Sequence, residues 1–289
     1  MNIAQSAVQS SSTLFLVSRP RFWLYLAGPV LVGAAWGADS LAALYSLPVL
    51  VLFLYFLVPA NLVLYGINDR FDREVDANNP KKGDREIVWQ RDPTITGAIV
   101  VASAVGVATF YVTPVAAWGY LAGFFLLAVL YSTPPFRLKA RPVVDSVANG
   151  LYILPGTAMY VTLAGVHPPL VALIGAWLWT MGMHTFSAIP DIDPDRRAGI
   201  QTTATTVGVR GALVYCVLCW SATAIVFGSI DLRAGALLSI YPAFLLIIHF
   251  GSVSIRRAYW WFPALNTVVG AVLTIAGMWE VVDVPGVIG

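Results

Sequence analysis

The stretch that decides the fold runs from residue 46 to residue 85 and reads SLPVLVLFLYFLVPANLVLYGINDRFDREVDANNPKKGDR. Its first half is an almost unbroken apolar run, and the part from residue 65 onward contains five acidic and five basic residues. An apolar run of about 20 residues is long enough to cross a bilayer core about 30 Å thick. Charges near a membrane are costly unless they have partners. The stretch therefore predicts a membrane-spanning helix over 46–67 that ends in a charged, functional segment.

The composition of the whole chain extends this interpretation. Of its 289 residues, 58% are hydrophobic and 11% are charged, and the mean hydropathy is +0.76. These values exclude a soluble enzyme and predict an all-α polytopic membrane protein. We expect a single transmembrane domain over 1–289, with a polar cytoplasmic tail at 1–20, surrounding membrane lipid and no nucleic-acid partner. The predicted spans are 22–38, 46–67, 94–112, 116–132, 146–164, 169–189, 209–228, 235–250 and 263–281.

The distribution of basic residues predicts the orientation. If the amino terminus is cytoplasmic, sixteen of the seventeen Lys and Arg fall in cytoplasmic segments, and only Arg233 falls on the other side. Lys and Arg concentrate in cytoplasmic loops of membrane proteins. The bias predicts a cytoplasmic amino terminus in the cell membrane, and nine spans then place the carboxyl terminus outside.

Two acidic clusters fall at predicted helix ends on this cytoplasmic side. Asn68, Asp72 and Asp76 are spaced four residues apart, so they share one face if the second helix continues. Asn61 and Tyr65 extend that face into the membrane. The second cluster lies in IPDIDPDRRAGIQTT at 189–203, where Asp191 and Asp195 are again four apart and Asp193 lies between them.

Carboxylate oxygens in this arrangement suit Mg²⁺, which is usually bound through one or two carboxylates and substrate phosphates. Basic residues follow each cluster and could hold phosphate oxygens. They are Lys81, Lys82 and Arg85 after the first, Arg196 and Arg197 after the second, and Arg137 and Lys139 in YSTPPFRLK at 131–139. The pattern predicts a diphosphate site at the mouth of a helix bundle.

Two other interpretations of the charges stay open at this point. The clusters could be solvated loops that obey the positive-inside rule, or they could mark the ion pathway of a transporter. Transporter sites lie mostly near the bilayer midplane on broken helices. The acids of this sequence are nearly absent from mid-span positions, which favours an enzyme that takes a polar head from the cytoplasm and an apolar tail from the bilayer.

Three segments together resemble the UbiA superfamily of intramembrane prenyltransferases. NDRFDREVD at 68–76 resembles its first aspartate-rich motif, DIDPDRRAGIQT at 191–202 resembles its second, and YSTPPFRLK resembles the Tyr and Lys segment between them. The resemblance implies about nine helices around a central cavity. Within the superfamily, SRPRFW at 18–23 and YGINDRFDREVDANNPKKG at 65–83 are similar to the lycopene elongase branch, which makes C50 carotenoids.

The resemblance also implies roles for individual residues and a Mg²⁺ cofactor. Asn68, Asp72, Asp191 and Asp195 would bind Mg²⁺, supported by Asp69 and Asp76. Diphosphate contacts would come from Lys81, Arg137, Lys139 and Arg197, and Tyr131 would lie beside the allylic carbon. Asp193 departs from the commonest spacing of the second motif, and its role stays open between a further acid of the site and a water-facing charge.

The reaction that the resemblance implies is transfer of a prenyl group from an allylic diphosphate to a lipophilic isoprenoid acceptor. For an elongase, dimethylallyl diphosphate would be the donor and lycopene the acceptor. The cation left on the acceptor would then lose a proton or capture water. The alternative within the superfamily is a longer donor with a quinone precursor or a glycerol ether lipid as acceptor.

Several other residues are considered for the cavity. His184 lies seven residues before Asp191 and could receive the released proton, or it could be a packing histidine. Asp145 and Asn149 could reach the site, or Asp145 could cap a helix. The aromatic residues Tyr152, Tyr160 and Trp179 could line the cavity or pack in the bundle. We expect Cys216 and Cys219 to be small apolar helix residues.

Overall fold

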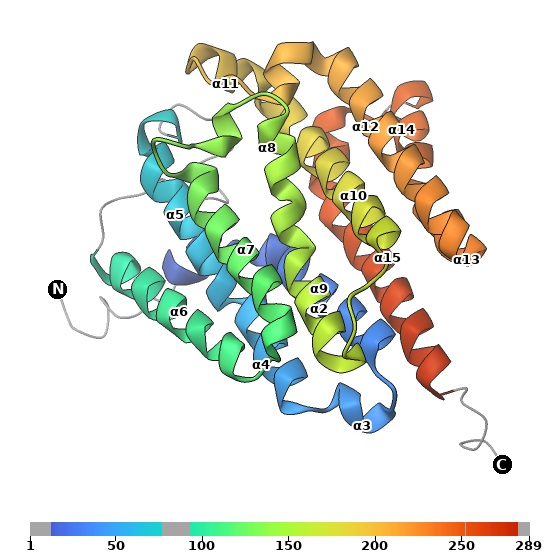
Figure 1. Cartoon of the computed structure of the whole chain (residues 1–289). Coiled ribbons are helices and arrows are strands. Elements are labelled where there is room, and N and C mark those ends of the chain that lie inside the picture. Colours follow the sequence, from blue (N-terminus) through green and yellow to red (C-terminus); the bar gives the residue numbers. More distant parts are fainter. Residues whose placement is uncertain (1–12, 77–92, 252, 283–289) are drawn as a thin grey trace.

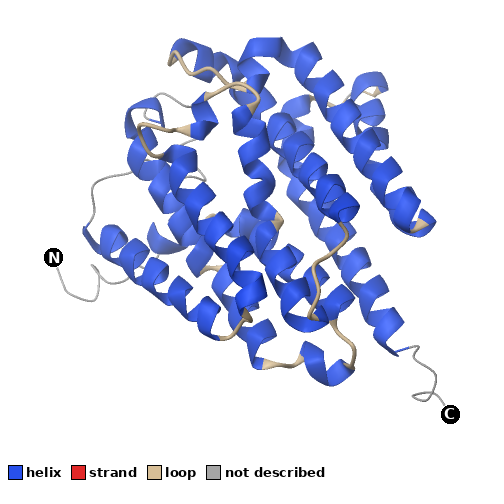
Figure 2. Cartoon of the chain, viewed as in Figure 1, coloured by secondary structure: helices blue, strands red, loops and turns tan. Residues whose placement is uncertain are grey.

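The computed structural model describes residues 13–76, 93–251 and 253–282 (Figure 1). Helices make up almost all of this part of the chain, and it contains no strand (Figure 2). The all-α prediction is confirmed. Residues 13–17 are already helical. The α-helices that follow are α2 (Trp23–Gly37), α3 (Leu41–Leu44), α4 (Leu47–Leu57), α5 (Pro59–Asp76), α6 (Pro93–Tyr111), α7 (Val115–Ser132), α8 (Val144–Val147), α9 (Leu154–Ala164), α10 (Leu170–Ala188), α11 (Ile192–Arg197), α12 (Thr203–Ile230), α13 (Leu232–Leu238), α14 (Ile240–Phe250) and α15 (Ile255–Val282).

Eight helical segments of the described chain are long and apolar enough to cross a membrane. They match the predicted spans from the second to the ninth. The first predicted span, 22–38, corresponds to α2, which has 15 residues. At 1.5 Å per residue this helix is about 22 Å long, less than the hydrocarbon core of about 30 Å. The preceding 3₁₀ turn η1 (Pro20–Phe22) adds to its length.

The second span is broken where α4 meets α5. Pro59 begins α5 directly after Val58, so backbone carbonyls near the break lose their usual helical donors. The side chain of Asn61 donates to the carbonyl oxygens of Phe56 at 2.9 Å and Leu57 at 3.0 Å. Asn61 therefore stabilises the break, although it shares a helix with the predicted acidic face.

The centre of the bundle is the segment formed by α8, the 3₁₀ helix η3 (Ala148–Tyr152) and α9. It is the most buried of the candidate spans, and α2, α7 and α10 pack against it (Figure 1). Helices in membranes approach closely where small residues meet. A Cβ atom at Gly156 of α9 would overlap the carbonyl oxygen of Pro29 of α2, and one at Gly33 of α2 would overlap the Gly156 backbone. Glycine at both positions allows α2 and α9 to touch.

The charged segments gather at one end of the bundle. The 3₁₀ helices η2 (Leu138–Ala140) and η4 (Ile189–Asp191), with α11 and the start of α12, lie at this end, at the top of Figure 1. At the opposite end of α12, Arg233 forms ion pairs with Asp231 at 2.9 Å and Glu280 at 3.3 Å. The fold thus separates Arg233 from the predicted site by the length of a span.

Candidate active site

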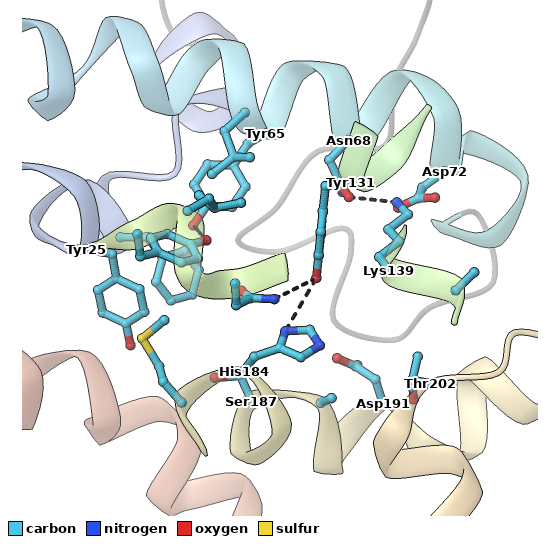
Figure 3. Close-up of a pocket in the computed structure, with 18 of the residues that line it drawn as sticks. Tyr25, Tyr65, Asn68, Asp72, Tyr131, Lys139, His184, Ser187, Asp191 and Thr202 are labelled. Carbon is cyan, nitrogen blue, oxygen red and sulfur yellow. Dashed lines mark hydrogen bonds and ion pairs between the residues drawn. The ribbon is translucent and has the colours of Figure 1, made fainter. Parts of the chain in front are cut away.

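A cavity of about 260 Å³ opens at the charged end, between α5, α7, η3, α10 and η4. Seven predicted site residues line it, and they come from segments far apart in the sequence (Figure 3). They are Asn68, Asp72, Tyr131, Arg137, Lys139, Asp191 and Asp195. The structure thus places the two acidic motifs and the segment between them on one cavity.

The first motif is held by donors from the segment after α7. Lys139 Nζ contacts a carboxylate oxygen of Asp72 and lies 2.7 Å from Asn68 Oδ1. Arg137 Nη2 lies 3.1 Å from the other carboxylate oxygen of Asp72. Ser132 donates to Asn68 Oδ1 at 3.0 Å. Two cations therefore balance the buried Asp72 carboxylate, and the network joins the first motif to the YSTPPFRLK segment.

The second motif lies across the cavity from the first. Figure 3 shows Asp191 and Thr202 on the side opposite Asn68 and Asp72. Asp191 ends η4, and Asp195 follows one turn later on α11. Asp193 is exposed and is not part of the cavity lining, which fits the interpretation as a water-facing charge.

Two other predicted residues, Arg197 and Asp69, have described positions outside this lining. Arg197 is exposed and is not part of the lining, so its position does not support the predicted diphosphate contact. Asp69 is buried and forms an ion pair with Arg19 at 2.7 Å. The side chain of Asp76 and the whole of Lys81 lie outside the described residues, as do Lys82 and Arg85.

Beyond Tyr131 the cavity is lined by aromatic rings. The hydroxyl groups of Tyr65 and Tyr152 lie 3.2 Å apart, and the Tyr25 and Tyr152 rings meet edge to face at 6.0 Å. Figure 3 shows Tyr131 between Tyr25 and Tyr65 on one side and Lys139 on the other. The cavity therefore has a charged end and an aromatic end, and Tyr131 stands at their boundary.

The aromatic lining differs in part from the sequence expectations. Of the three aromatic residues proposed from the sequence, Tyr152 lines the cavity, whereas Tyr160 and Trp179 do not. The Trp179 ring packs on Tyr241 instead. Sequence reasoning missed Tyr25, Ser187 and Arg19 as lining residues. Arg19 lies in the quoted SRPRFW segment, which was the one available signal, and its guanidinium lies 4.5 Å from the centre of the Tyr65 ring.

A fully buried carboxylate lies behind the cavity wall. Asp145 accepts hydrogen bonds from the backbone nitrogen of Thr203 at 2.9 Å and from the Thr203 hydroxyl group. His184 Nε2 lies 3.3 Å from the same carboxylate, and His184 Nδ1 lies 3.4 Å from the Tyr131 hydroxyl oxygen. Asp145 does not cap its own helix α8, because its partners come from α10 and the start of α12. Asp145 therefore contacts His184, which lines the cavity, and does not line the cavity itself.

Strained backbone accompanies the site. Three residues other than glycine have positive φ angles in the described chain: Arg19 at 49°, Arg137 at 38° and Val143 at 70°. Such conformations are unfavourable and persist where the surrounding structure fixes them. Arg19 and Arg137 line the cavity, and the backbone nitrogen of Val143 donates to the Thr203 hydroxyl oxygen at 2.7 Å. The strained residues thus include two arginines of the cavity lining and a residue that contacts Thr203, a hydrogen-bond partner of Asp145.

The donor set of the cavity fits Mg²⁺ bound together with phosphate oxygens. Asn68, Asp72, Asp191 and Asp195 present one amide and three carboxylate groups to a single space. Within the described ranges, no three His, Cys, Asp or Glu side chains are clustered so that they alone could hold a metal. Magnesium is commonly held by only one or two carboxylates when a substrate phosphate completes its shell.

Comparison with known proteins identifies the family. Residues 26–279 match the UbiA prenyltransferase family. A lycopene elongase/hydratase of Haloferax volcanii is 55% identical over 270 residues, which cover 93% of this chain and 90% of the relative. A lycopene elongase/hydratase of Halobacterium salinarum is 54% identical over 272 residues, which cover 93% of this chain and 98% of the relative.

The fold has a solved counterpart in a UbiA homologue from Archaeoglobus fulgidus bound to DMAPP and Mg²⁺. The TM-score is 0.71 at 21% sequence identity, and the superposition covers 94% of this chain and 99% of the other. The family match covers seven candidate membrane helices, most of the eighth and all seven of the predicted residues that line the cavity. The chain is an integral membrane prenyltransferase and belongs to the UbiA prenyltransferase family.

Proposed function

We propose that this enzyme transfers the five-carbon group of dimethylallyl diphosphate to lycopene and adds water to the product. The observation that carries this proposal is the cavity in which the two acidic motifs face each other, in a chain 55% identical to a lycopene elongase/hydratase. Its volume of about 260 Å³ suits a short donor, because pockets for larger ligands occupy roughly 300–1,000 Å³.

The charged end of the cavity would bind the diphosphate. Asn68, Asp72, Asp191 and Asp195 would hold Mg²⁺, which supplies positive charge where the leaving diphosphate becomes more negative. Lys139 and Arg137 lie beside Asp72 and would donate hydrogen bonds to phosphate oxygens. Lys81 and Arg197 stay predicted as further diphosphate contacts, and Asp69 and Asp76 as supporting residues.

The aromatic end would receive the allylic group and one end of the acceptor. Ring faces of Tyr25, Tyr65 and Tyr152 can stabilise a cation. Tyr131, at the boundary between the two ends, would lie beside the allylic carbon. A cavity this small leaves most of a forty-carbon acceptor outside.

An adjoining groove offers a place for the rest of the acceptor. It shares Arg19 and Phe22 with the cavity and runs along the start of α15, where Trp260, Trp261 and Pro263 line it. Trp261 is largely exposed. We place the apolar body of lycopene along this groove, in contact with the membrane lipid.

The cavity mouth would face the cytoplasm. Arg19, Arg137 and Lys139 line the cavity, whereas Arg233 lies at the far end of α12. Basic residues favour the cytoplasmic side of membrane proteins. The proposed location is the cell membrane, with the amino terminus inside.

The test is the carotenoid mass profile of a lycopene-accumulating bacterial host that expresses this chain. We expect products heavier by one and two C5 units, each with added water, and we expect none from Asp72→Ala or Asp191→Ala. The matched control is Asp193→Ala, because Asp193 belongs to the second motif but is exposed and outside the cavity lining. Its products should equal those of the wild type.

Other outcomes would redirect the proposal. Unchanged lycopene with well-inserted wild-type protein would contradict elongation and favour a quinone precursor or glycerol ether lipid with a longer donor. Full activity of both Asp72→Ala and Asp191→Ala would contradict the metal site. In purified enzyme, EDTA should stop turnover and added Mg²⁺ should restore it.

A further inference from the structure

Prenyl transfer to an alkene releases one proton for each group transferred. The allylic C–O bond breaks and its electron pair leaves with the diphosphate, while the alkene π pair forms the new C–C bond and leaves a tertiary cation. When water adds to this cation, its oxygen forms a C–O bond and one of its protons must depart. Direct loss of a proton from the cation releases one proton as well. The cavity therefore needs a proton acceptor in either case.

Tyr131, His184 and Asp145 form a connected line from the cavity into the protein. The Tyr131 hydroxyl oxygen lies 3.4 Å from His184 Nδ1, and His184 Nε2 lies 3.3 Å from Asp145 Oδ2. Tyr131 and His184 line the cavity, whereas Asp145 is completely buried behind them. Figure 3 shows the imidazole ring directed toward the Tyr131 hydroxyl group.

The surroundings of Asp145 favour its anionic form. Its carboxylate receives the backbone N–H and the hydroxyl group of Thr203 as well as the His184 ring. An ionised carboxylate only accepts hydrogen bonds, so three donors suit it. Thr203 is the first residue of α12, whose amino end carries a partial positive charge. A capping box between Thr202 and Thr205 fixes that helix end.

This arrangement determines which His184 nitrogen can accept a proton. An anionic Asp145 accepts a hydrogen bond from the Nε2–H group of His184, which leaves the lone pair of Nδ1 directed at Tyr131. The side-chain nitrogen of Asn149 lies 3.4 Å from the Tyr131 oxygen and donates to it. Since Asn149 occupies an acceptor position of that oxygen, the Tyr131 proton is free to point toward His184.

We propose that His184 accepts the proton that the reaction releases, and that Tyr131 passes it on. The water proton goes to the Tyr131 oxygen as the Tyr131 proton goes to His184 Nδ1, and no atom is oxidised or reduced. Asp145 acts as a positioning residue, because it holds the ring and balances the imidazolium charge. This assignment rests on the proposed function and names the proton acceptor within it.

Other ionisable groups surround this part of α10. The elements packed against it contribute Asp145, Tyr152, Asp191, Tyr215 and Cys216, and α7 contributes Tyr131. Asp191 is proposed to hold Mg²⁺, and Tyr215 shares a hydrogen bond with Ser146 at 2.8 Å. The main rival for the proton is the released diphosphate itself, which would make His184 dispensable.

The experiment compares purified enzymes supplied with lycopene, dimethylallyl diphosphate and Mg²⁺. His184→Gln keeps a donor for Asp145 but lacks a basic nitrogen, so turnover should fall by roughly 10²- to 10⁴-fold, the usual contribution of general acid–base catalysis. The KM for dimethylallyl diphosphate should stay unchanged. The matched control, His249→Gln, changes an exposed histidine beside Phe250 and should leave turnover unchanged.

Asp145 gives a second readout. Asp145→Asn should lower kcat, measured per folded enzyme, and leave KM unchanged. A purely structural role would lower only the yield of folded protein. If His184→Gln does not fold, Tyr131→Phe should show the same loss of kcat, because it removes the group that passes the proton.

Two results would overturn the assignment, and they can be told apart. Wild-type rate and products from His184→Gln would assign the proton to the diphosphate and leave the proposed function intact. If His184→Gln does not fold, full activity of Tyr131→Phe would likewise assign the proton to the diphosphate. Absence of any C5 addition by the wild-type enzyme would overturn the proposed function, and this assignment with it.

Discussion

Lys139 Nζ lies 2.7 Å from the Oδ1 atom of Asn68, 71 residues away along the chain. The same ammonium group contacts Asp72 one turn further along α5. One cation thus binds two proposed metal ligands. In the proposed function the charges of the diphosphate and Mg²⁺ would replace this pairing, and Lys139 would turn to the phosphate oxygens.

Replacing Lys139 should lower kcat/KM for dimethylallyl diphosphate. Hydrogen bonds to charged groups contribute roughly 1.5–3 kcal/mol, so Lys139→Gln should lower kcat/KM for dimethylallyl diphosphate by roughly 10- to 100-fold. Arg141→Gln is the matched control, because Arg141 is exposed in the same segment and donates to the Pro135 carbonyl oxygen. Equal kcat/KM values for the two variants would show that Lys139 does not bind the diphosphate.

The Arg19 and Asp69 ion pair should matter mainly for stability. Their side chains are 15% and 3% exposed, and loss of one partner from a buried pair costs about 3–5 kcal/mol. Arg19→Met should lower the melting temperature, because a carboxylate then stays buried without that cation. The double variant Arg19→Met with Asp69→Asn should melt at a higher temperature than Arg19→Met alone. A double variant that is less stable than the single one would refute this coupling.

Close packing of α2 on α9 should not tolerate a side chain at Gly156. Gly156→Ala places a methyl group against the Pro29 carbonyl oxygen, and overpacking typically costs about 1–3 kcal/mol. Thermal unfolding in detergent measures the loss. Gly119→Ala on α7 is the control, since no atom lies within 4 Å of its added methyl group. Equal melting temperatures for the two variants would contradict close contact between α2 and α9.

Cysteine labelling tests the orientation. Asp193 near the cavity mouth and Arg233 at the other end of α12 are both exposed, whereas the native Cys216 and Cys219 are buried. In intact cells, a membrane-impermeant maleimide should label Arg233→Cys and spare Asp193→Cys until the cells are opened. The unmodified chain is the control and should stay unlabelled. The reverse pattern would place the cavity mouth outside the cytoplasm.

The sequence predicted the spans well because apolar length is a local property. Residues 94–112 were predicted as a span, and α6 is Pro93–Tyr111. The spacing of Asn68 and Asp72 likewise predicted a shared helix face, and both residues line the cavity. Arg197 is exposed beside the second motif, and its contact with the diphosphate stays a prediction.

The sequence by itself determined that this chain crosses a membrane many times and places two acidic motifs at helix ends, because hydrophobic length and helical spacing act between neighbours. Only the tertiary structure decided the partners of Asp145. Thr203 is 58 residues from it and His184 is 39 residues from it along the chain. The contact between the Tyr65 and Tyr152 hydroxyl groups, 87 residues apart, could not be predicted from the sequence for the same reason. Such contacts depend on how α5, η3, α10 and α12 pack together, which local spacing does not encode.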